Sequence, residues 1–259
     1  MRYPKTKMFL GLIAAAILWI VVSGIEPDRA DAGLAPVSTQ PGNGAVLVIG
    51  GTRATGLEIV KLLRARGDDV IVLARPDSKT ADAESTGARI ARGDAMNPGD
   101  FAAIFAGGGI RAVVSTLGAR SLEGPRPDFE GNRNAIDAAK AAGVSRYVLV
   151  SVIGAGDSWD TAPWVAQQFL KNLFPEKTRA EDYLRASGLA YTIIRPGGLL
   201  EKEAQGRVYL TPDTGAMSWI RRADLARLSV QALDDPDAIG QVYHAHDPDR
   251  TRFWSIPLN

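Results

Sequence analysis

Short, wholly apolar segments alternate with amphipathic segments along most of this chain, and this alternation limits the available folds more than any other feature. We expect strands at residues 45–49, 69–74, 88–91, 112–116, 146–152, 191–194 and 241–244. We expect helices at residues 57–66, 101–105, 132–142, 163–174, 175–187 and 223–233. Strands of continuous Val, Ile and Leu are typical of a parallel sheet that helices cover on both faces. The sequence therefore predicts an α/β fold built on a doubly wound parallel sheet.

Composition excludes several classes of function. The 259 residues carry 30 Lys and Arg against 29 Asp and Glu, which leaves no basic footprint for nucleic acid. The chain has no Cys, so disulfides, thiolate nucleophiles and Cys-based metal sites are excluded. Its two histidines, His244 and His246, alternate at the end of the last expected strand with no third ligand evident, and no metal site is predicted.

The N-terminus is predicted to lie outside the globular domain. Three basic residues within the first seven precede an uncharged apolar run at residues 8–25. Its length of about 18 residues is close to the minimum that a helix needs to span a bilayer. An A-x-A cleavage signal follows at residues 30–32, so residues 1–32 are either a signal peptide or an uncleaved N-terminal membrane anchor. Basic residues before the run favour a cytoplasmic N-terminus, so the rest of the chain would lie on the opposite side of the membrane. Residues 33–43 then form a linker, and residues 44–259 form one domain.

The first expected strand runs into a glycine turn and then a helix, between Val46 and Leu57. Gly50 permits the tight turn and Gly56 lets the helix pack close to the sheet, so that free N–H groups at the helix N-terminus meet a pyrophosphate. The predicted phosphate-binding residues are Gly50, Thr52, Arg53, Ala54, Thr55 and Gly56. Arg53 stands where a middle glycine is common, and its side chain either obstructs the ligand or aims its guanidinium at a phosphate. Alternatively, the glycines serve only the packing of helix on sheet.

The end of the second expected strand indicates the type of dinucleotide. A site for NAD usually has an acidic residue there that holds the ribose hydroxyls. Here the strand ends in Arg75, about 19 residues beyond Gly56, where that acid is expected. A guanidinium suits a 2′-phosphate through paired N–H donors, and Arg53 is placed to close on the same group. NADP(H) is therefore expected rather than NAD(H), unless Arg75 is an ordinary surface residue.

The segment VLVIGGTRATGLEIVKLLRARGDDVIVLAR resembles the opening of atypical short-chain dehydrogenase/reductase proteins, of the NmrA-like and NAD(P)H-binding, biliverdin-reductase-B-like kind. The resemblance extends over residues 45–246 and implies a Rossmann-type fold. Its most distinctive part runs from Lys177 to Gly197. The further cofactor-binding residues that it implies are Asp94 and Ala95 at the adenine, Thr116, Leu117, Gly118 and Lys177 on the nicotinamide-ribose side, and Pro196 and Gly197 after the sixth strand.

The expected chemistry lacks one common group. Many related reductases carry Tyr-x-x-x-Lys on a helix, where the Lys lowers the pKa of the Tyr and the phenol donates a proton. Leu173 lies four residues before Lys177, so this acid is missing, and a hydride transfer would take its proton from solvent, the substrate or another donor. The catalytic candidates are Ser151, which matches the family's fifth-strand serine and suits a substrate carbonyl, and Lys177. Alternatively, Ser151 caps backbone groups and Lys177 is a solvated helix charge.

Two further features have competing interpretations. Four aromatic residues between the fifth strand and the helix of Lys177 either wall an apolar substrate pocket or pack a surface segment: Trp159, Trp164, Phe169 and Phe174. The pair Arg221 and Arg222 is interpreted as a solvated helix start rather than an anion site.

The sequence thus predicts an NADPH-dependent oxidoreductase that reduces a small carbonyl, quinone or flavin-like substrate, without a nucleic-acid partner. The alternative is a non-catalytic NAD(P)H-binding protein, either a redox sensor or a membrane-associated assembly factor, which the missing Tyr and the N-terminal segment favour. Export or anchoring in the inner membrane is expected from residues 1–32, with membrane association through residues 8–25. Because NADPH is a cytoplasmic cofactor, a cytoplasmic location of the domain stays open.

Overall fold

In the computed structural model, eight strands form one sheet in the order β3-β2-β1-β4-β5-β6-β10-β8. The structure describes residues 38–119 and 126–251. The strands of this sheet are β1 Ala45–Ile49, β2 Val70–Ala74, β3 Arg89–Arg92, β4 Ile110–Ser115, β5 Arg146–Val150, β6 Tyr191–Pro196, β8 Tyr209–Thr211 and β10 Gln241–His246. Neighbouring strands are parallel, except that β8 runs antiparallel to β10. The strand order reverses between β1 and β4, the position at which open α/β sheets bind ligands.

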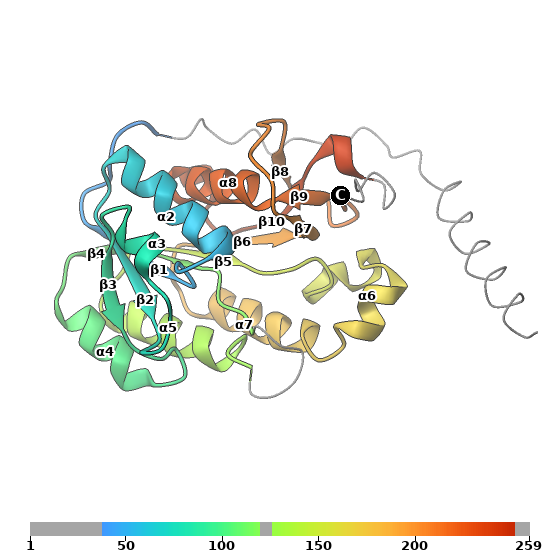
Figure 1. Cartoon of the computed structure of the whole chain (residues 1–259). Coiled ribbons are helices and arrows are strands. Elements are labelled where there is room, and N and C mark those ends of the chain that lie inside the picture. Colours follow the sequence, from blue (N-terminus) through green and yellow to red (C-terminus); the bar gives the residue numbers. More distant parts are fainter. Residues whose placement is uncertain (1–37, 120–125, 252–259) are drawn as a thin grey trace, which may run out of the picture.

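Helices cover both faces of the sheet (Figure 1). On one face, α2 (Ala54–Arg66) packs along α8 (Arg222–Asp234). On the other face lie α4 (Pro98–Ala106), α5 (Glu130–Ala141) and α7 (Phe174–Ala186). The shorter elements are α3 Ala81–Glu84, α6 Trp164–Phe169 and 3₁₀ helices at Gly156–Thr161, Pro236–Ala238 and Pro248–Arg250. The expected doubly wound, Rossmann-type α/β fold is therefore confirmed.

The core consists of two apolar layers, and β1 contributes to both. Val46 and Val48 pack in the layer that includes the aliphatic residues of α2 and α8. Leu47 and Ile49 point the other way, into the layer that contains Phe101 of α4 and the apolar residues of α5 and α7. Successive side chains of a strand point to opposite faces, so a strand that is apolar at every position is buried on both sides.

Several element boundaries differ from those expected. α2 begins at Ala54 rather than at residue 57, because the glycine turn passes directly into the helix. The expected helix at residues 163–174 forms only as α6, which ends at Phe169, and α7 begins at Phe174. β6 continues through Pro196, since β10 pairs with it up to that residue.

Three short strands are absent from the sequence prediction. β7 (Gly198–Leu200) and β9 (Trp219–Arg221) pair with each other as a separate two-stranded sheet, and β8 pairs at the edge of the main sheet. A strand of three residues is too short to show a periodicity, so only its distant pairing partner reveals it.

The predicted signal peptide or membrane anchor at residues 1–32 lies outside the described residues, as does the first part of the linker predicted at residues 33–43. Between residues 38 and 119 and between 126 and 251, no helix combines the length and apolar character that crossing a membrane requires. The domain boundary at residue 44 stays a prediction, and β1 begins one residue later.

Candidate functional site

A cavity of about 700 Å³ opens at the strand ends where the strand order reverses. The predicted site residues in its lining are Gly50, Thr52, Arg53, Ala54, Thr55, Gly56, Arg75, Asp94, Ala95, Thr116, Leu117, Gly118, Ser151, Lys177 and Pro196. Leu199 of β7 and Arg222 of α8 also line the cavity, and the sequence pattern predicts neither. A volume of this size is typical of sites for small molecules and cofactors.

The turn between β1 and α2 leaves no room for a side chain at Gly50 or at Gly56. Gly50 has a φ of +83°, and a Cβ there would lie 2.6 Å from Thr116 Oγ1. A Cβ on Gly56 would lie 2.2 Å from the carbonyl oxygen of Gly50, so α2 crosses the turn at contact distance. Thr116 Oγ1 donates to the carbonyl of Ile49 at 3.1 Å and ties the turn to the end of β4. The glycines do serve helix–sheet packing, and this packing brings the N-terminus of α2 to the cavity.

The backbone of this turn is strained at Ala54. With a φ of +51°, Ala54 is the one non-glycine residue of positive φ in the part of the chain that the structure describes. Such strain often marks ligand-binding sites. α2 has no acidic residue in its first turn, and its N-cap residue, Arg53, makes no side-chain cap. A phosphate group is the ligand that suits N–H groups arranged in this way.

We expect Ala54→Gly to raise the free energy of unfolding by about 1 kcal/mol, because glycine adopts a positive φ without the clash of a Cβ. Urea denaturation measures the change. Ala103→Gly is the matched control: Ala103 lies exposed in the middle of α4, and its replacement should lower stability by roughly 0.5–1 kcal/mol. A loss of stability in both variants would show that Ala54 is unstrained.

Lys177 is a buried cation on the wall of the cavity. It is 6% exposed, and its Nζ donates to the carbonyl of Leu117 at 2.6 Å. The same Nζ lies 3.3 Å from Oδ1 of Asp128, which is fully buried just before α5. Burial lowers the pKa of Lys177, and the charge of Asp128 opposes that shift. The interpretation of Lys177 as a solvated helix charge is therefore wrong. No motif marks Asp128, because the pairing arises only where α5 and α7 meet.

Ser151 offers an unpaired hydroxyl to the same cavity. Its backbone N–H donates to the carbonyl of Ile194 at 2.7 Å, which fixes the residue beyond the end of β5. Ser151 is 6% exposed, and its Oγ has no hydrogen-bond partner among the described residues. Ser151 thus does not cap a backbone group. Since buried hydroxyls are normally paired, this one suits an oxygen or nitrogen atom of a ligand.

The remaining predicted residues divide between the rim of the cavity and the packing around it. Arg75 is exposed on the rim where β2 ends. The carboxylate of Asp94 accepts the N–H of Met96 at 2.9 Å and so shapes the loop after β3. Gly197 is the one predicted cofactor residue that is absent from the cavity lining. A Cβ there would lie 2.2 Å from the carbonyl oxygen of Ser218, so packing against the segment before β9 requires this glycine.

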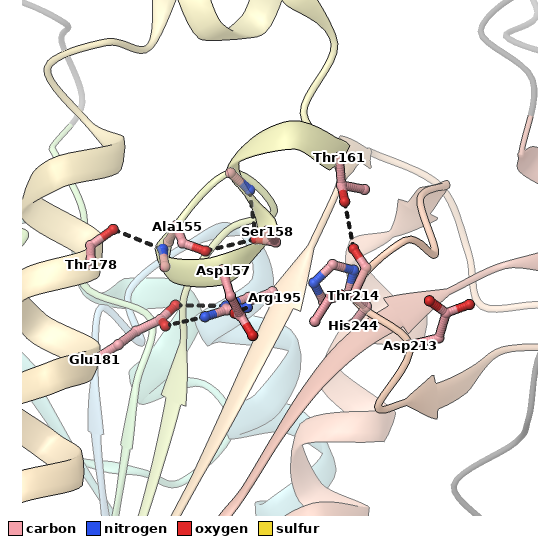
Figure 2. A network of polar contacts seen from close by, with 12 residues as sticks. Ala155, Asp157, Ser158, Thr161, Thr178, Glu181, Arg195, Asp213, Thr214 and His244 are labelled. Carbon is pink, nitrogen blue, oxygen red and sulfur yellow. Dashed lines mark hydrogen bonds and ion pairs between the residues drawn. The ribbon is translucent and has the colours of Figure 1, made fainter.

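Figure 2 shows a polar network around the buried Arg195 that the sequence analysis missed. Arg195 of β6 makes two parallel bonds to Glu181 of α7, from Nε to Oε1 at 3.0 Å and from Nη2 to Oε2 at 2.6 Å. Asp157, in the 3₁₀ turn after β5, accepts a third bond from Arg195. The N–H of Gly156 donates to Thr178 Oγ1 at 2.8 Å. This network joins β6, α7 and the turn after β5, the three segments that present Pro196, Lys177 and Ser151.

The two histidines lie buried in β10 and away from the cavity. His244 Nδ1 is 2.7 Å from the carbonyl oxygen of Ala216, and burial lowers the pKa of His244. Across the described residues, no group of three or more His, Cys, Asp or Glu could hold a metal ion.

The four aromatic residues from Trp159 to Phe174 do not form one wall of a pocket. Trp159 and Phe174 pack edge to face, with ring centroids 5.7 Å apart. Trp164 and Phe169 of α6 are each 71% exposed. None of the four lines the cavity, so the first pair packs the segment and the second faces outward.

The interpretation of Arg221 and Arg222 as a solvated pair is also wrong. Arg221 is 2% exposed and donates to Asp247 at 3.1 Å. Arg222 lines the cavity and has a side chain that is 25% exposed. Arg221 is the last residue of β9, which pairs with β7, and Arg222 is the first residue of α8.

Comparisons with known proteins identify the family of this chain. Residues 50–236 match the model of a family described as NAD(P)H-binding. The uncharacterized sugar epimerase YhfK of Bacillus subtilis is 30% identical over 212 residues, which cover 79% of this chain and 94% of that protein. NAD(P)H azoreductase of Xenophilus azovorans is 29% identical, over 78% of this chain and 68% of that protein.

A solved structure is similar over almost its whole length. ChuY of Escherichia coli O157:H7, described as an anaerobillin reductase, has 30% sequence identity and a TM-score of 0.72, over 79% of this chain and 98% of that chain. The family match covers most of the chain and includes the glycine turn, Arg75 and Lys177. The chain therefore belongs to the NAD(P)H-binding family of atypical, NmrA-like short-chain dehydrogenase/reductases.

Proposed function

We propose that this protein is an NADPH-dependent oxidoreductase that reduces a small carbonyl, quinone or flavin-like molecule. The observation that carries the proposal is the cavity at the strand ends, with Arg75 where sites for NAD hold an acid. Similarity to the azoreductase and to ChuY supports a reductase. Sanguinarine reductase of Eschscholzia californica is 35% identical over 137 residues, which cover 44% of this chain and 47% of that protein, and this similarity also supports a reductase.

Each part of the cavity suits one part of the coenzyme. The N-terminus of α2 would bind the diphosphate, and Arg75 would bind the 2′-phosphate. Lys177, held by Leu117 and Asp128, would orient the hydroxyls of the nicotinamide ribose. The bound coenzyme supplies the hydride.

The chain's own contribution to the chemistry is mainly positioning. The unpaired Ser151 hydroxyl would donate a hydrogen bond to the substrate oxygen and hold it beside the nicotinamide. Leu173 precedes Lys177 by four residues and supplies no phenol, so we assign the proton to solvent.

Coenzyme preference tests the proposal directly. Wild type should bind NADPH more tightly than NADH, and Arg75→Ala should weaken NADPH binding about 10-fold or more while NADH binding changes little. Calorimetric titration of the full-length protein measures both affinities. Arg89→Ala is the control, since Arg89 is an exposed arginine of β3 that pairs with Asp69 outside the cavity. Equal affinities in wild type, or an unchanged preference in Arg75→Ala, would refute the assignment of Arg75.

The alternative function is a non-catalytic NAD(P)H-binding sensor or assembly factor. The missing phenol favours it, as does 27% identity to the photosystem II assembly factor Ycf39 of Synechocystis, of which the chain covers 61%. Oxidation of NADPH in the presence of a quinone, a flavin or an aldehyde separates the two functions. Turnover with any of them supports the reductase, and coenzyme binding without turnover supports the sensor.

The N-terminal segment carries a separate proposal about location. We propose that residues 1–32 export the domain or anchor it to the inner membrane through the apolar run at residues 8–25. Cell fractionation with N-terminal sequencing of the mature protein distinguishes a cleaved signal from an anchor. It also reports whether the domain instead lies in the cytoplasm.

A further inference from the structure

Arg222 stands beside the phosphate-binding turn although it is far from that turn in the sequence. It is the first residue of α8, and its Nη1 lies 3.4 Å from Oγ1 of Thr55, the second residue of α2. Both residues line the cavity. The N-termini of the two helices therefore meet at the same wall, and Arg222 adds a full positive charge to the partial charge of the α2 terminus.

The second contact of Arg222 is with an exposed carboxylate. Its Nε donates to Oε1 of Glu201, which follows β7 and has a side chain that is 74% exposed. Within the described residues these are the polar contacts of Arg222, so three of its five N–H donors remain for another acceptor. An exposed carboxylate contributes little to such a pair, and a ligand with a stronger negative charge can replace it.

We propose that Arg222 binds the coenzyme diphosphate together with the N-terminus of α2, and that Glu201 holds its guanidinium until the coenzyme arrives. The inference rests on the proposed function, whose site it extends. A guanidinium binds two phosphate oxygens through paired N–H donors, and the contact with Thr55 places it where those oxygens meet the helix terminus. Arg75, at the end of β2, remains for the 2′-phosphate.

This assignment predicts opposite effects for the two partners of the ion pair. NADPH and NADH carry the same diphosphate, so Arg222 raises both affinities by a similar factor, whereas Arg75 raises only that for NADPH. Glu201 competes with the diphosphate for one cation, so its removal strengthens the binding of both coenzymes. If the pair served only the stability of the fold, loss of either residue would weaken binding.

Calorimetric titration of the full-length protein with NADPH, NADH and adenosine 2′-monophosphate tests the proposal. Arg222→Gln should weaken NADPH and NADH binding by about 10- to 100-fold each, and leave binding of the monophosphate unchanged. Glu201→Gln should tighten binding of both coenzymes about two- to fivefold, and this gain should vanish in the double variant. Arg227→Gln, on the same helix but outside the cavity lining, should leave all three affinities unchanged.

Thermal unfolding without coenzyme identifies any variant that fails to fold. If Arg222→Gln fails to fold, Glu201→Gln still tests the inference, because the side chain of Glu201 is exposed and its replacement should leave the fold intact. Wild-type affinity in Arg222→Gln, a loss confined to NADPH, or weaker binding in Glu201→Gln would each overturn the inference. Failure of the wild type to bind either coenzyme would instead overturn the proposed function.

Discussion

Replacing Glu181 with glutamine should lower the free energy of unfolding by about 3–5 kcal/mol, because it removes one charge of a buried ion pair and leaves the other. Glu181 and Arg195 are both fully buried and joined by two parallel hydrogen bonds. The amide of Gln presents N–H donors to a guanidinium that has only donors, so one bond is lost. Arg195 then keeps only Asp157 as a charged partner, and the side chain of Asp157 is 69% exposed. For a domain of this size, the thermal midpoint should fall by roughly 6–20 °C.

Asp182→Asn is the matched control for this change. Asp182 is the next residue of α7, pairs with Arg185 at 2.9 Å, and has a side chain that is 62% exposed. Its replacement should change stability by less than about 1 kcal/mol. Replacing both Glu181 and Arg195 with methionine should recover part of the loss, since no unpaired charge remains in the core. Similar midpoints for Glu181→Gln and Asp182→Asn would contradict the assignment of a strong buried pair.

Replacing Gly56 with alanine should abolish most coenzyme binding as well as destabilise the domain. The added Cβ would lie 2.2 Å from the Gly50 carbonyl oxygen and 2.8 Å from Thr116 Oγ1, and the first of these is a backbone atom. α2 must therefore move away from the turn, which costs about 1–3 kcal/mol of stability. Because the helix N-terminus moves with it, we expect affinity for NADPH to fall by about 100-fold or more.

Gly107→Ala is the control, because it makes the same glycine-to-alanine change at a position that has room for a Cβ. Gly107 caps α4 with a φ of −67°, and a Cβ there would meet only the Ile104 carbonyl oxygen at 3.7 Å, an ordinary contact. Stability and NADPH affinity should stay close to those of wild type. Denaturation curves and calorimetric titration of both variants measure the difference. Unchanged NADPH affinity in Gly56→Ala would remove the turn from the site.

The parts of the site that could be read from the sequence are those that one short segment builds. Gly50 and Gly56 belong to a single strand–turn–helix unit, so their spacing already indicates a turn too tight for side chains at these two positions. Arg75 could be placed because the end of β2 has a regular distance from that turn in dinucleotide-binding folds. The strain at Ala54 escaped prediction, since alanine gives no sign of a positive φ in its sequence context.

The residues that sequence reasoning missed are those whose role depends on another element. Asp128 precedes α5, and it matters only because Lys177 of α7 reaches it. The sequence places Arg195 next to the sixth strand but does not show that its charge is buried against the carboxylate of Glu181 from α7. In the sequence Arg222 resembles any solvated helix start, and only the tertiary structure shows that it lines the cavity.

The order of apolar strands and helices by itself determined the doubly wound sheet, and the spacing of Gly50 and Gly56 determined the tight turn between β1 and α2, because backbone conformation and side-chain alternation depend on neighbouring residues. Only the tertiary structure decided which charges pair, which hydroxyl stays unpaired and which arginine reaches the site. These outcomes depend on distances of a few ångströms between segments far apart in the chain, and electrostatic and hydrogen-bond energies change steeply over such distances.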